Sequence, residues 1–372
     1  MPARMPLAAI RRNVTRLMVS MADALCKTLP MSSLRRFKFA VPFALVLALF
    51  SPASAQVDEE AGFQGYLQLL AARARSEGVS ERSIQALTTG LTFNPKVIRL
   101  DRAQPGSNPD KPPSIWNYIR THVDPVRIGG GRREMASLGA EANKIEAEYG
   151  VPAKVVIAIW GHETNYGSYK GDFDLARSLA TLAYEGRRRE LFADEFVALL
   201  KMADRGVPRQ RMVGSWAGAF GNPQFLPTVY LRLARDGNGD GDIDIWHNRA
   251  DTLASIANYF RDAGWRPGEP WGVRVSIPAG FDRNLVSPRL EAPSCARVHA
   301  RHSLWRTVAE WKAMGIQPQA PLADQTMAAL FEPDGPGTGA FLLTGNYRVI
   351  LQYNCSNYYA LSVGLLADEI AR

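Results

Sequence analysis

The sequence is poor in the residues that most often bind metals or carry redox chemistry. Its 372 residues include 3 cysteines and 5 histidines, the latter at positions 122, 162, 247, 299 and 302. A His-Glu pair on a helix suggests a zinc protease, but that motif needs a second histidine four residues after the first, and Tyr166 stands there. This excludes the zincin class. His299 and His302 have no carboxylate or thiol pattern around them, so we expect surface or internally hydrogen-bonded histidines.

The chain also lacks a sustained excess of charge. It has 44 Lys and Arg against 36 Asp and Glu, a formal net charge of +8. Residues 1–55 hold eight of the basic side chains and one of the acidic ones, which leaves 36 basic and 35 acidic side chains over 56–372. The body of the protein is therefore almost neutral, which gives no support to nucleic acid as a partner. A hydrophobic content of 46% in so long a chain is enough for a core and argues against disorder.

No hydrophobic run near the N-terminus is long enough to span a bilayer. The apolar segment 39–50 has 12 residues, whereas a spanning helix needs about 20. A basic segment (35–38) precedes it and Ala53-Ser54-Ala55 follows, which is the layout of a secretory signal peptide. We predict a signal peptide over 31–55 that is cleaved before Gln56, with translation starting at Met31. A membrane anchor is the alternative, but no cysteine follows the cleavage point to carry a lipid.

Export changes the interpretation of the cysteines. Cys26 leaves with the leader, and Cys295 and Cys355 remain as an even pair in an oxidising compartment. We predict a disulfide between them. Two separate buried thiols are the alternative.

The order of hydrophobic patterns predicts a mainly α protein of the α+β class, with a small β portion late in the chain. Proline- and glycine-rich stretches at 104–113 and 128–131 are predicted loops. We expect an N-terminal helical region (56–150), a central helical core (151–270) and a C-terminal part (271–372) that contains the β portion and a last helix. Predicted helices cover 58–75, 81–89, 132–149, 153–163, 189–205 and 250–263, and strand-like alternation covers 271–278 and 340–353.

Glu163 is the first candidate for chemistry. It ends a helix that begins after Val151-Pro152 and is apolar on nearly every side (AKVVIAIWGHE), and it precedes the polar segment 164–167. Partial removal from water disfavours the charged carboxylate, so its pKa rises towards neutrality, as a general acid requires. The plainer alternative is a surface or ion-paired glutamate.

A second candidate segment, residues 215–230, alternates small residues with aromatics and contains Gln-Phe-x-Pro. Glycines would let a ligand approach the backbone, aromatic rings offer flat faces to sugars, and Gln224 supplies both a donor and an acceptor. A tightly packed glycine and aromatic turn is the alternative.

The third segment, residues 236–244, has the spacing of a calcium loop. Oxygen-bearing side chains stand at positions 1, 3 and 5, with glycine at 6 and Ile243 at 8. The usual glutamate at position 12 is replaced by His247, so Asp251 is the candidate closing carboxylate. A solvated Asp/Gly turn is the alternative.

Taken together, the segments GHETNYG, ATLAYEGRRRELF, GSWAGAFGNPQFLPTVY, DGNGDGDIDIW, SIANYF and YNCSNYYALSVGLLADEI resemble the membrane-bound lytic murein transglycosylase B family. The similarity covers residues 60–372. It implies a lysozyme-like helical core with an EF-hand-like calcium loop, and a periplasmic enzyme whose partners are peptidoglycan glycan strands. It implies no cofactor for the chemistry and a structural calcium ion. The lipid-anchoring cysteine of the membrane-bound relatives is absent, so we expect no stable membrane anchor after signal cleavage.

The resemblance also assigns residues. The catalytic glutamate of the Gly-x-Glu-Thr motif corresponds to Glu163. The sugar-facing positions correspond to Ser215, Gln224, Phe225, Tyr230, Arg187, Arg188, Tyr259, Tyr353, Asn354, Tyr358 and Tyr359. The calcium ligands correspond to Asp236, Asn238, Asp240, Asp242 and Asp251, the last of which stands one residue further along than the family pattern.

The resemblance predicts cleavage of the β-1,4 bond between N-acetylmuramic acid and N-acetylglucosamine by a single carboxyl, with formation of a 1,6-anhydro end. Ordinary glycosidases need two carboxylates, and only Asp172 and Asp174 lie close to Glu163 in sequence. Two alternatives remain at this point: a hydrolytic muramidase that uses Glu163 and water, and a peptidoglycan-binding protein without catalysis.

Overall fold

The computed structural model describes residues 52–103 and 113–372. The predicted signal peptide (31–55), as far as residue 51, and the predicted loop (104–113), as far as residue 112, lie outside the described residues. The helices up to the middle of the chain are α2 (Pro52–Ser76), α3 (Glu81–Thr88), α4 (Pro95–Arg102), α5 (Ile115–His122), α6 (Pro125–Leu138), α7 (Ala140–Tyr149), α8 (Ala153–Thr164), α9 (Leu175–Glu185) and α10 (Arg189–Asp204). The later helices are α11 (Pro227–Leu233), α12 (Arg249–Asp262), α13 (Ala296–His299), α14 (Val308–Ala313), α15 (Gly345–Tyr353) and α16 (Asn357–Ile370), with 3-10 turns at Arg209–Arg211 and Arg283–Val286.

Short polar side chains begin several of the helices. Asp174 accepts a hydrogen bond from the third residue of α9, Asn248 caps α12, and Ser356 caps α16. These side-chain oxygens satisfy backbone N–H groups that have no partner inside the helix. The predictions for 189–205 and 250–263 are confirmed by α10 and α12.

The helix predicted over 132–149 is divided at Gly139, which has a positive φ of 50°, into the end of α6 and α7. Two further predictions of local structure are wrong. The glycine-rich stretch 128–131 lies inside α6 and not in a loop. The alternating segment 340–353 is a strand only at its start and then becomes α15. In both places contacts with distant residues outweigh the local signal.

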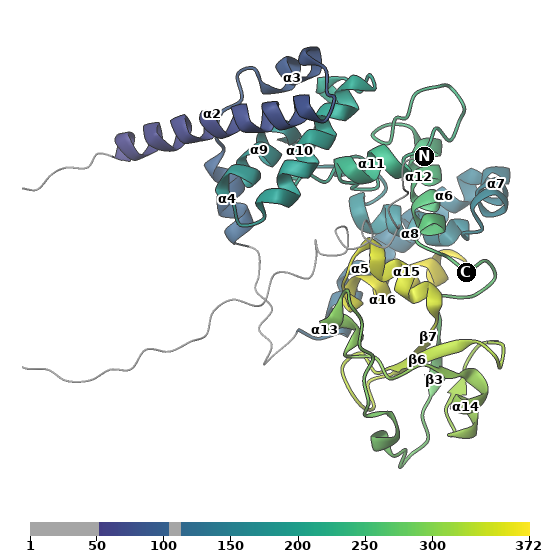
Figure 1. The fold of residues 1–372 in the computed structure, drawn as a ribbon. Coiled ribbons are helices and arrows are strands. Elements are labelled where there is room, and N and C mark those ends of the chain that lie inside the picture. The colour runs from purple at the N-terminus through teal and green to yellow at the C-terminus, as the bar shows by residue number, and fades with distance from the viewer. Residues whose placement is uncertain (1–51, 104–112) are drawn as a thin grey trace, which may run out of the picture.

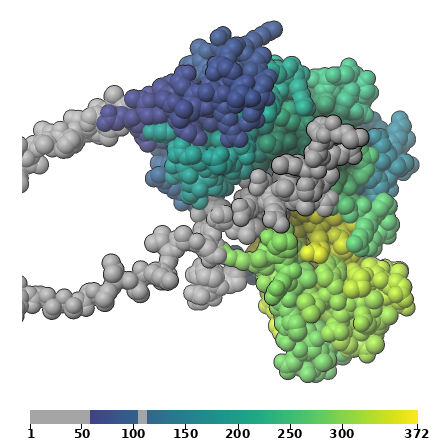
Figure 2. All heavy atoms as spheres, in the orientation of Figure 1, coloured from purple at the N-terminus to yellow at the C-terminus, as the bar shows by residue number. Residues whose placement is uncertain are grey.

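The helices form one continuous body and the sheet lies at its end (Figure 1). The helices α2, α3 and α4 pack against α9 and α10, while α16 packs against α8, α5 and α6. Figure 2 shows the sheet portion as a separate bulge below the helices in the same orientation. The mainly helical fold class with a small β portion is thus confirmed.

The main sheet has five antiparallel strands in the order β4-β6-β7-β3-β5. In chain order they are β3 (Gly272–Ser276), β4 (Arg306–Thr307), β5 (Gln317–Pro318), β6 (Met327–Phe331) and β7 (Ala340–Leu343). A two-stranded sheet pairs β1 (Phe173–Asp174) with β2 (Val213–Gly214). β3 confirms the strand predicted over 271–278.

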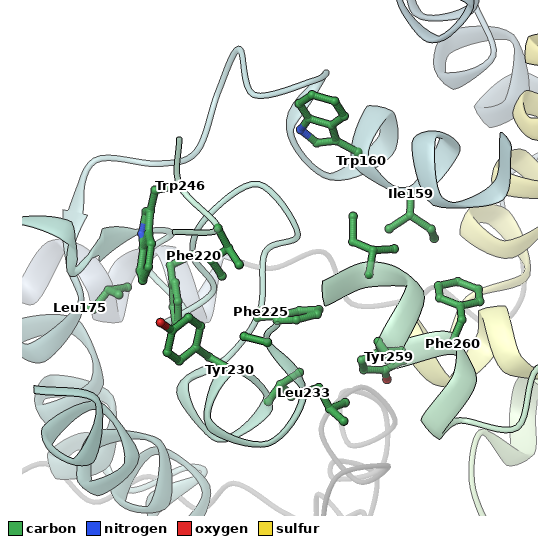
Figure 3. Close-up of a cluster of buried hydrophobic side chains, with 14 of the residues drawn as sticks. Ile159, Trp160, Leu175, Phe220, Phe225, Tyr230, Leu233, Trp246, Tyr259 and Phe260 are labelled. Atoms are coloured by element: carbon green, nitrogen blue, oxygen red, sulfur yellow. The ribbon is translucent and has the colours of Figure 1, made fainter. Parts of the chain in front are cut away.

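Two hydrophobic clusters support this architecture. The larger joins all the helical parts and includes α8, α12, α15 and α16. The smaller lies between the sheet and α14 around Trp311, which is fully buried. Figure 3 shows part of the larger cluster, in which Phe220, Tyr230 and Trp246 gather on one side of Phe225, and Tyr259 and Phe260 of α12 lie on the other. Among the described residues, no helix has the length and apolarity needed to cross a membrane.

Candidate active site

Helix α8 carries Glu163 at its next-to-last position. Most residues of the helix are buried, including every residue from 155 to 161, because neighbouring helices surround it. A helix held on all sides is a rigid support for a side chain at its end. The Glu163 side chain remains partly accessible to solvent, so a ligand can reach it.

The helix ends in three consecutive residues with left-handed backbone: Asn165 (φ 48°), Tyr166 (φ 58°) and Gly167 (φ 84°). Non-glycine residues adopt this conformation at a cost and need support from their surroundings. Tyr166 receives that support, because its hydroxyl donates to the Arg127 carbonyl at 2.7 Å. Its ring lies so close to Gly161 and Gly130 that a Cβ on either would come within 2.6 Å and 2.5 Å of ring atoms.

Glu163 has a carboxyl suited to acid–base chemistry. Burial raises its pKa to about 7, and a hydrogen bond from Tyr359 partly opposes that rise. The Tyr359 hydroxyl donates to Glu163 Oε1 at 2.6 Å. Removal from water disfavours the negative form, whereas a donor aimed at the oxygen favours it. A carboxyl with a pKa near neutrality can give up a proton and take one back at the pH of the medium.

The structure brings four of the predicted sugar-facing aromatics together beside Glu163. Tyr359 stacks on Tyr353 with ring centroids 6.5 Å apart, and Tyr353 meets Tyr259 edge-on at 4.7 Å. Phe225 completes the group, 5.9 Å from the Tyr259 ring. Burial raises the pKa of the Tyr353 and Tyr359 hydroxyls well above their usual value, so both stay protonated.

A second aromatic column, not predicted as part of the site, contacts Tyr359 through His162, with ring centroids 5.5 Å apart. The rings of His162, His122 and Tyr118 follow one another, with centroids 6.0 Å apart for the two histidines and 3.7 Å for His122 and Tyr118. Burial lowers the pKa of His162 to about 3, so this imidazole is neutral. Burial raises the pKa of Tyr118, and the negative charge of the nearby Glu163 carboxyl adds to that rise. The four-residue spacing of Tyr118 and His122 on the short amphipathic α5 was the available signal.

Ser215 and Gln224 lie in the tightly turned first part of the second candidate segment, residues 215–230. Ser215 Oγ accepts from the Ala219 N–H at 3.0 Å, and Gln224 has left-handed backbone (φ 50°) with its Nε2 donating to the Gly221 carbonyl at 2.9 Å. The glycines of this segment are required by packing, since a Cβ on Gly221 would come within 2.8 Å of Ile245. The structure therefore supports the packed-turn alternative for the glycines and leaves the two polar side chains at the turn's edge.

The other predicted sugar-facing residues have structural partners elsewhere. Arg187 and Arg188 both bind the carboxylate of Asp101, which is 2% exposed. Tyr230 is buried, and its hydroxyl donates to the Ile243 carbonyl at 2.9 Å.

The remaining two, Tyr358 and Asn354, flank the aromatic group. The Tyr358 ring meets Tyr118 edge-on at 5.6 Å, and its hydroxyl donates to the Pro113 carbonyl. Asn354 caps the end of α15.

No second carboxylate accompanies Glu163. In the described part of the chain, no Asp or Glu forms a hydrogen bond or ion pair with it, and the shift in its pKa has no contribution from another carboxylate. Asp174, one of the two acids close to it in sequence, caps α9 and pairs with Arg209. The site is therefore built around one acid.

The predicted calcium loop has the right donors in an unsuitable arrangement. Asp251 is fully buried, and its two oxygens accept from the N–H groups of Gly237 and Asp244. Asp236 likewise accepts two backbone N–H groups, and Asp242 binds Arg211. Within residues 52–103 and 113–372, no three His, Cys, Asp or Glu side chains are grouped closely enough to hold a metal. As arranged here, the loop does not fit a bound cation.

Cys295 and Cys355 form a disulfide with their Cα atoms 5.8 Å apart. Cys355 stands between Tyr353 and Tyr359 in the sequence, at the junction of α15 and α16. The bond therefore attaches the aromatic group beside Glu163 to the segment that starts α13.

Comparison with known proteins gives one consistent result. The chain matches the family described as Transglycosylase SLT domain over residues 62–368. Membrane-bound lytic murein transglycosylase B of Escherichia coli (strain K12) is 29% identical over 318 residues, which cover 82% of each protein. SltB3 from Pseudomonas aeruginosa, solved in complex with NAG-NAM-pentapeptide, is 39% identical with a TM-score of 0.74, covering 83% of this chain and 79% of that one. Escherichia coli lytic transglycosylase Slt35, solved in complex with calcium, is 26% identical with a TM-score of 0.65, covering 84% and 93%.

Proposed function

The chain belongs to the Transglycosylase SLT domain family, and we infer that it is a lytic transglycosylase that cleaves the glycan strands of peptidoglycan. The observation that carries the mechanism is the single partly buried carboxyl of Glu163, with a pKa of about 7 and Tyr359 as its hydrogen-bond donor.

In the first step, protonated Glu163 donates its proton to the oxygen of the β-1,4 bond between N-acetylmuramic acid and N-acetylglucosamine. The bond from C1 to that oxygen breaks, and the N-acetylglucosamine end leaves as an alcohol. Positive charge develops at C1 of the muramic acid, where the oxygen of its own N-acetyl group stabilises it. The substrate thereby supplies the group that a second carboxylate supplies in ordinary retaining glycosidases.

In the second step, the Glu163 carboxylate takes the proton of the C6 hydroxyl of the same sugar. The C6 oxygen bonds to C1, the bond to the N-acetyl oxygen is released, and a 1,6-anhydro ring forms. Glu163 is protonated again and no water is consumed. Tyr359 steadies the carboxylate between the two steps through its hydrogen bond.

The test is to digest purified peptidoglycan and weigh the soluble muropeptides. We expect products lighter by one water than the products of hydrolysis, absent with Glu163→Gln, which keeps the shape of the side chain and loses the titrating group. Products at the hydrolytic mass would show that water is the acceptor. Binding without any product would favour the non-catalytic protein.

We also propose that the 236–251 segment binds calcium for stability. The oxygen donors Asp236, Asn238 and Asp240 support this, as does the relative solved with calcium. Binding requires a rearrangement, because Asp242 would have to leave Arg211 and Asp251 would have to give up a backbone N–H. The ion would take no part in the reaction.

The remaining proposals rest on the sequence. Export to the periplasm through cleavage after Ala55 is supported by the basic, apolar and small-residue order of 31–55. A division of the mature chain at about 270 is supported by the second hydrophobic cluster, all of whose buried members lie beyond residue 272. The division at about 150 rests on the sequence alone, because the larger cluster includes residues on both sides of it. Mass measurement of the mature N-terminus tests the first, and limited proteolysis the second.

A further inference from the structure

One short segment on the sheet side of the molecule is attached to the start of α16 at three points. This segment, residues 295–302, contains Cys295, helix α13 and His302, and we call it the strap. Its first attachment is the disulfide from Cys295 to Cys355. The other two are hydrogen bonds to Asn357, the first residue of α16.

Asn357 is the centre of this attachment. Its Nδ2 donates to the Val298 carbonyl at 3.1 Å, and its Oδ1 lies 2.9 Å from His302 Nε2. The Tyr347 hydroxyl, on α15, also donates to Oδ1 at 3.1 Å. With the amide in this orientation Oδ1 can only accept, so His302 carries its proton on Nε2.

These groups are shielded from water. His302 is 2% exposed and Asn357 3% exposed, and the His302 ring packs edge-on against Phe331 of β6 at 5.0 Å. Burial lowers the pKa of His302 to about 3, so the imidazole stays neutral and keeps its role as a donor. A buried network with its donors and acceptors paired holds its members in one arrangement.

We propose that the strap positions Tyr359 against Glu163, and that His302 and the Cys295–Cys355 bond are positioning residues for catalysis. Tyr359 lies two residues after Asn357 in the first turn of α16, so a displacement of Asn357 displaces the Tyr359 hydroxyl. This inference rests on the function proposed above for Glu163, and it gives the sheet portion a part in the chemistry.

The consequence reaches Glu163 through one hydrogen bond. Among the described residues, burial and then the charge of Glu163 raise the pKa values of Tyr118 of α5, Tyr353 of α15 and Tyr359 of α16. The neutral His162 ring of α8 also packs against Tyr359, with ring centroids 5.5 Å apart. Within the described part of the chain only Tyr359 donates to the carboxyl, and that bond partly opposes the rise of the Glu163 pKa caused by burial. Loosening the hydrogen bond from Tyr359 therefore raises the pKa of Glu163. The acid then stays protonated up to a higher pH.

The experiment compares two substitutions at one position in the full chain. His302→Leu removes the donor to Asn357, whereas His302→Gln keeps an Nε2 donor at a similar distance from the backbone. The measurements are the alkaline limb of the pH dependence of kcat/KM on peptidoglycan and the titration of the Glu163 carboxyl by ¹³C NMR, assigned by difference with Glu163→Gln. Tyr359→Phe serves as the reference for complete loss of the hydrogen bond.

We expect His302→Leu to move both midpoints upward by about 0.5 to 1 pH unit, in the direction of Tyr359→Phe, with His302→Gln staying at the wild-type values. Cys295→Ala with Cys355→Ala should shift them the same way, and decides the matter if His302→Leu does not fold. A lower melting temperature with unmoved midpoints in both variants would overturn the proposal, because a merely structural strap has that result. The NMR titration needs no turnover. If the variants show the expected shifts but the wild-type protein releases no muropeptides, the positioning by the strap stands and the proposed function is refuted.

Discussion

At the scale of single residues, Glu163 combines two opposing influences on one carboxyl. Its surroundings raise the pKa to about 7, while Tyr359 favours the ionised form. This balance lets one group act first as an acid and then as a base, and it also has an effect on stability.

The folded protein binds the Glu163 proton more tightly than the unfolded chain does. Stability from this group is complete below the usual glutamate pKa of about 4.5 and is lost as the pH rises to about 7. Glu163→Gln cannot ionise, so we expect its melting temperature to match the wild type at pH 4.5 and to exceed it at pH 8. Scanning calorimetry at the two pH values measures this. If the melting temperatures of Glu163→Gln and the wild type differed by the same amount at pH 4.5 and pH 8, the fold would not favour the neutral form of the carboxyl.

Sequence patterns identified Glu163 because a buried helix that ends in a carboxyl and a polar, glycine-containing segment is a local signal. His302 and Asn357 could not be paired in the same way, since they lie 55 residues apart and meet only through the fold. The sequence placed His302 among satisfied or surface histidines, and its hydrogen bond to Asn357 confirms the first of these. Tyr118 was overlooked because an aromatic on a short amphipathic helix is indistinguishable from a core residue.

At the scale of elements, α6 shows why the glycine-rich stretch 128–131 was wrongly predicted to be a loop. A glycine-rich stretch reads as a loop, yet here two of the glycines are required inside a helix by contacts from other elements. A Cβ on Gly130 would lie 2.5 Å from the Tyr166 ring and one on Gly131 2.4 Å from Ile370. Gly129, in contrast, has no neighbour closer than the end of Arg133 at 3.5 Å.

Adjacent glycines thus provide a matched pair of substitutions. We expect Gly130→Ala to lower the free energy of unfolding by about 1 to 3 kcal/mol, because the ring must move. Gly129→Ala should raise it by about 0.5 to 1 kcal/mol through helix propensity. Urea denaturation measures both. Equal effects at the two positions would show that Tyr166 does not pack on α6 as described.

The calcium proposal concerns a single loop and is tested at that level. Protein freed of metal and then given calcium should melt at a higher temperature, because an ion that binds the folded state alone stabilises it. Magnesium serves as the ionic control, since it demands near-ideal octahedral geometry that this loop does not offer. Asp240→Asn replaces a negatively charged calcium ligand with a neutral one, so calcium should raise the melting temperature of this variant by less. An identical melting temperature with and without calcium would leave Asp251 as a purely structural carboxylate.

At the scale of the whole molecule, the sheet portion supports the helical site from two directions. The strap holds α16, and Asp334, in the loop after β6, accepts hydrogen bonds from the N–H groups of Ile115 and Trp116 at the start of α5. Helix α5 carries Tyr118, so both sides of Glu163 depend on residues outside the helical core.

Removal of the Asp334 carboxylate tests this support. Asp334→Ala leaves the first N–H groups of α5 without their partner and should cost about 1 kcal/mol of stability. Asp334→Asn keeps one acceptor oxygen and should cost less. Denaturation in urea compares the two, and an Asp334→Ala variant as stable as the wild type would show that α5 is held by its own Ser114 cap alone.

Tyr359 and Glu163 lie 196 residues apart along the chain. During biosynthesis the ribosome therefore makes the acid long before the hydroxyl that steadies it. The reactive centre cannot be assembled until α16 has arrived and docked on α8. A polypeptide released early, by a premature stop codon or a protease, would carry the glutamate without its partner. The acid of such a polypeptide would lack the donor that opposes the rise of its pKa, because that donor belongs to α16.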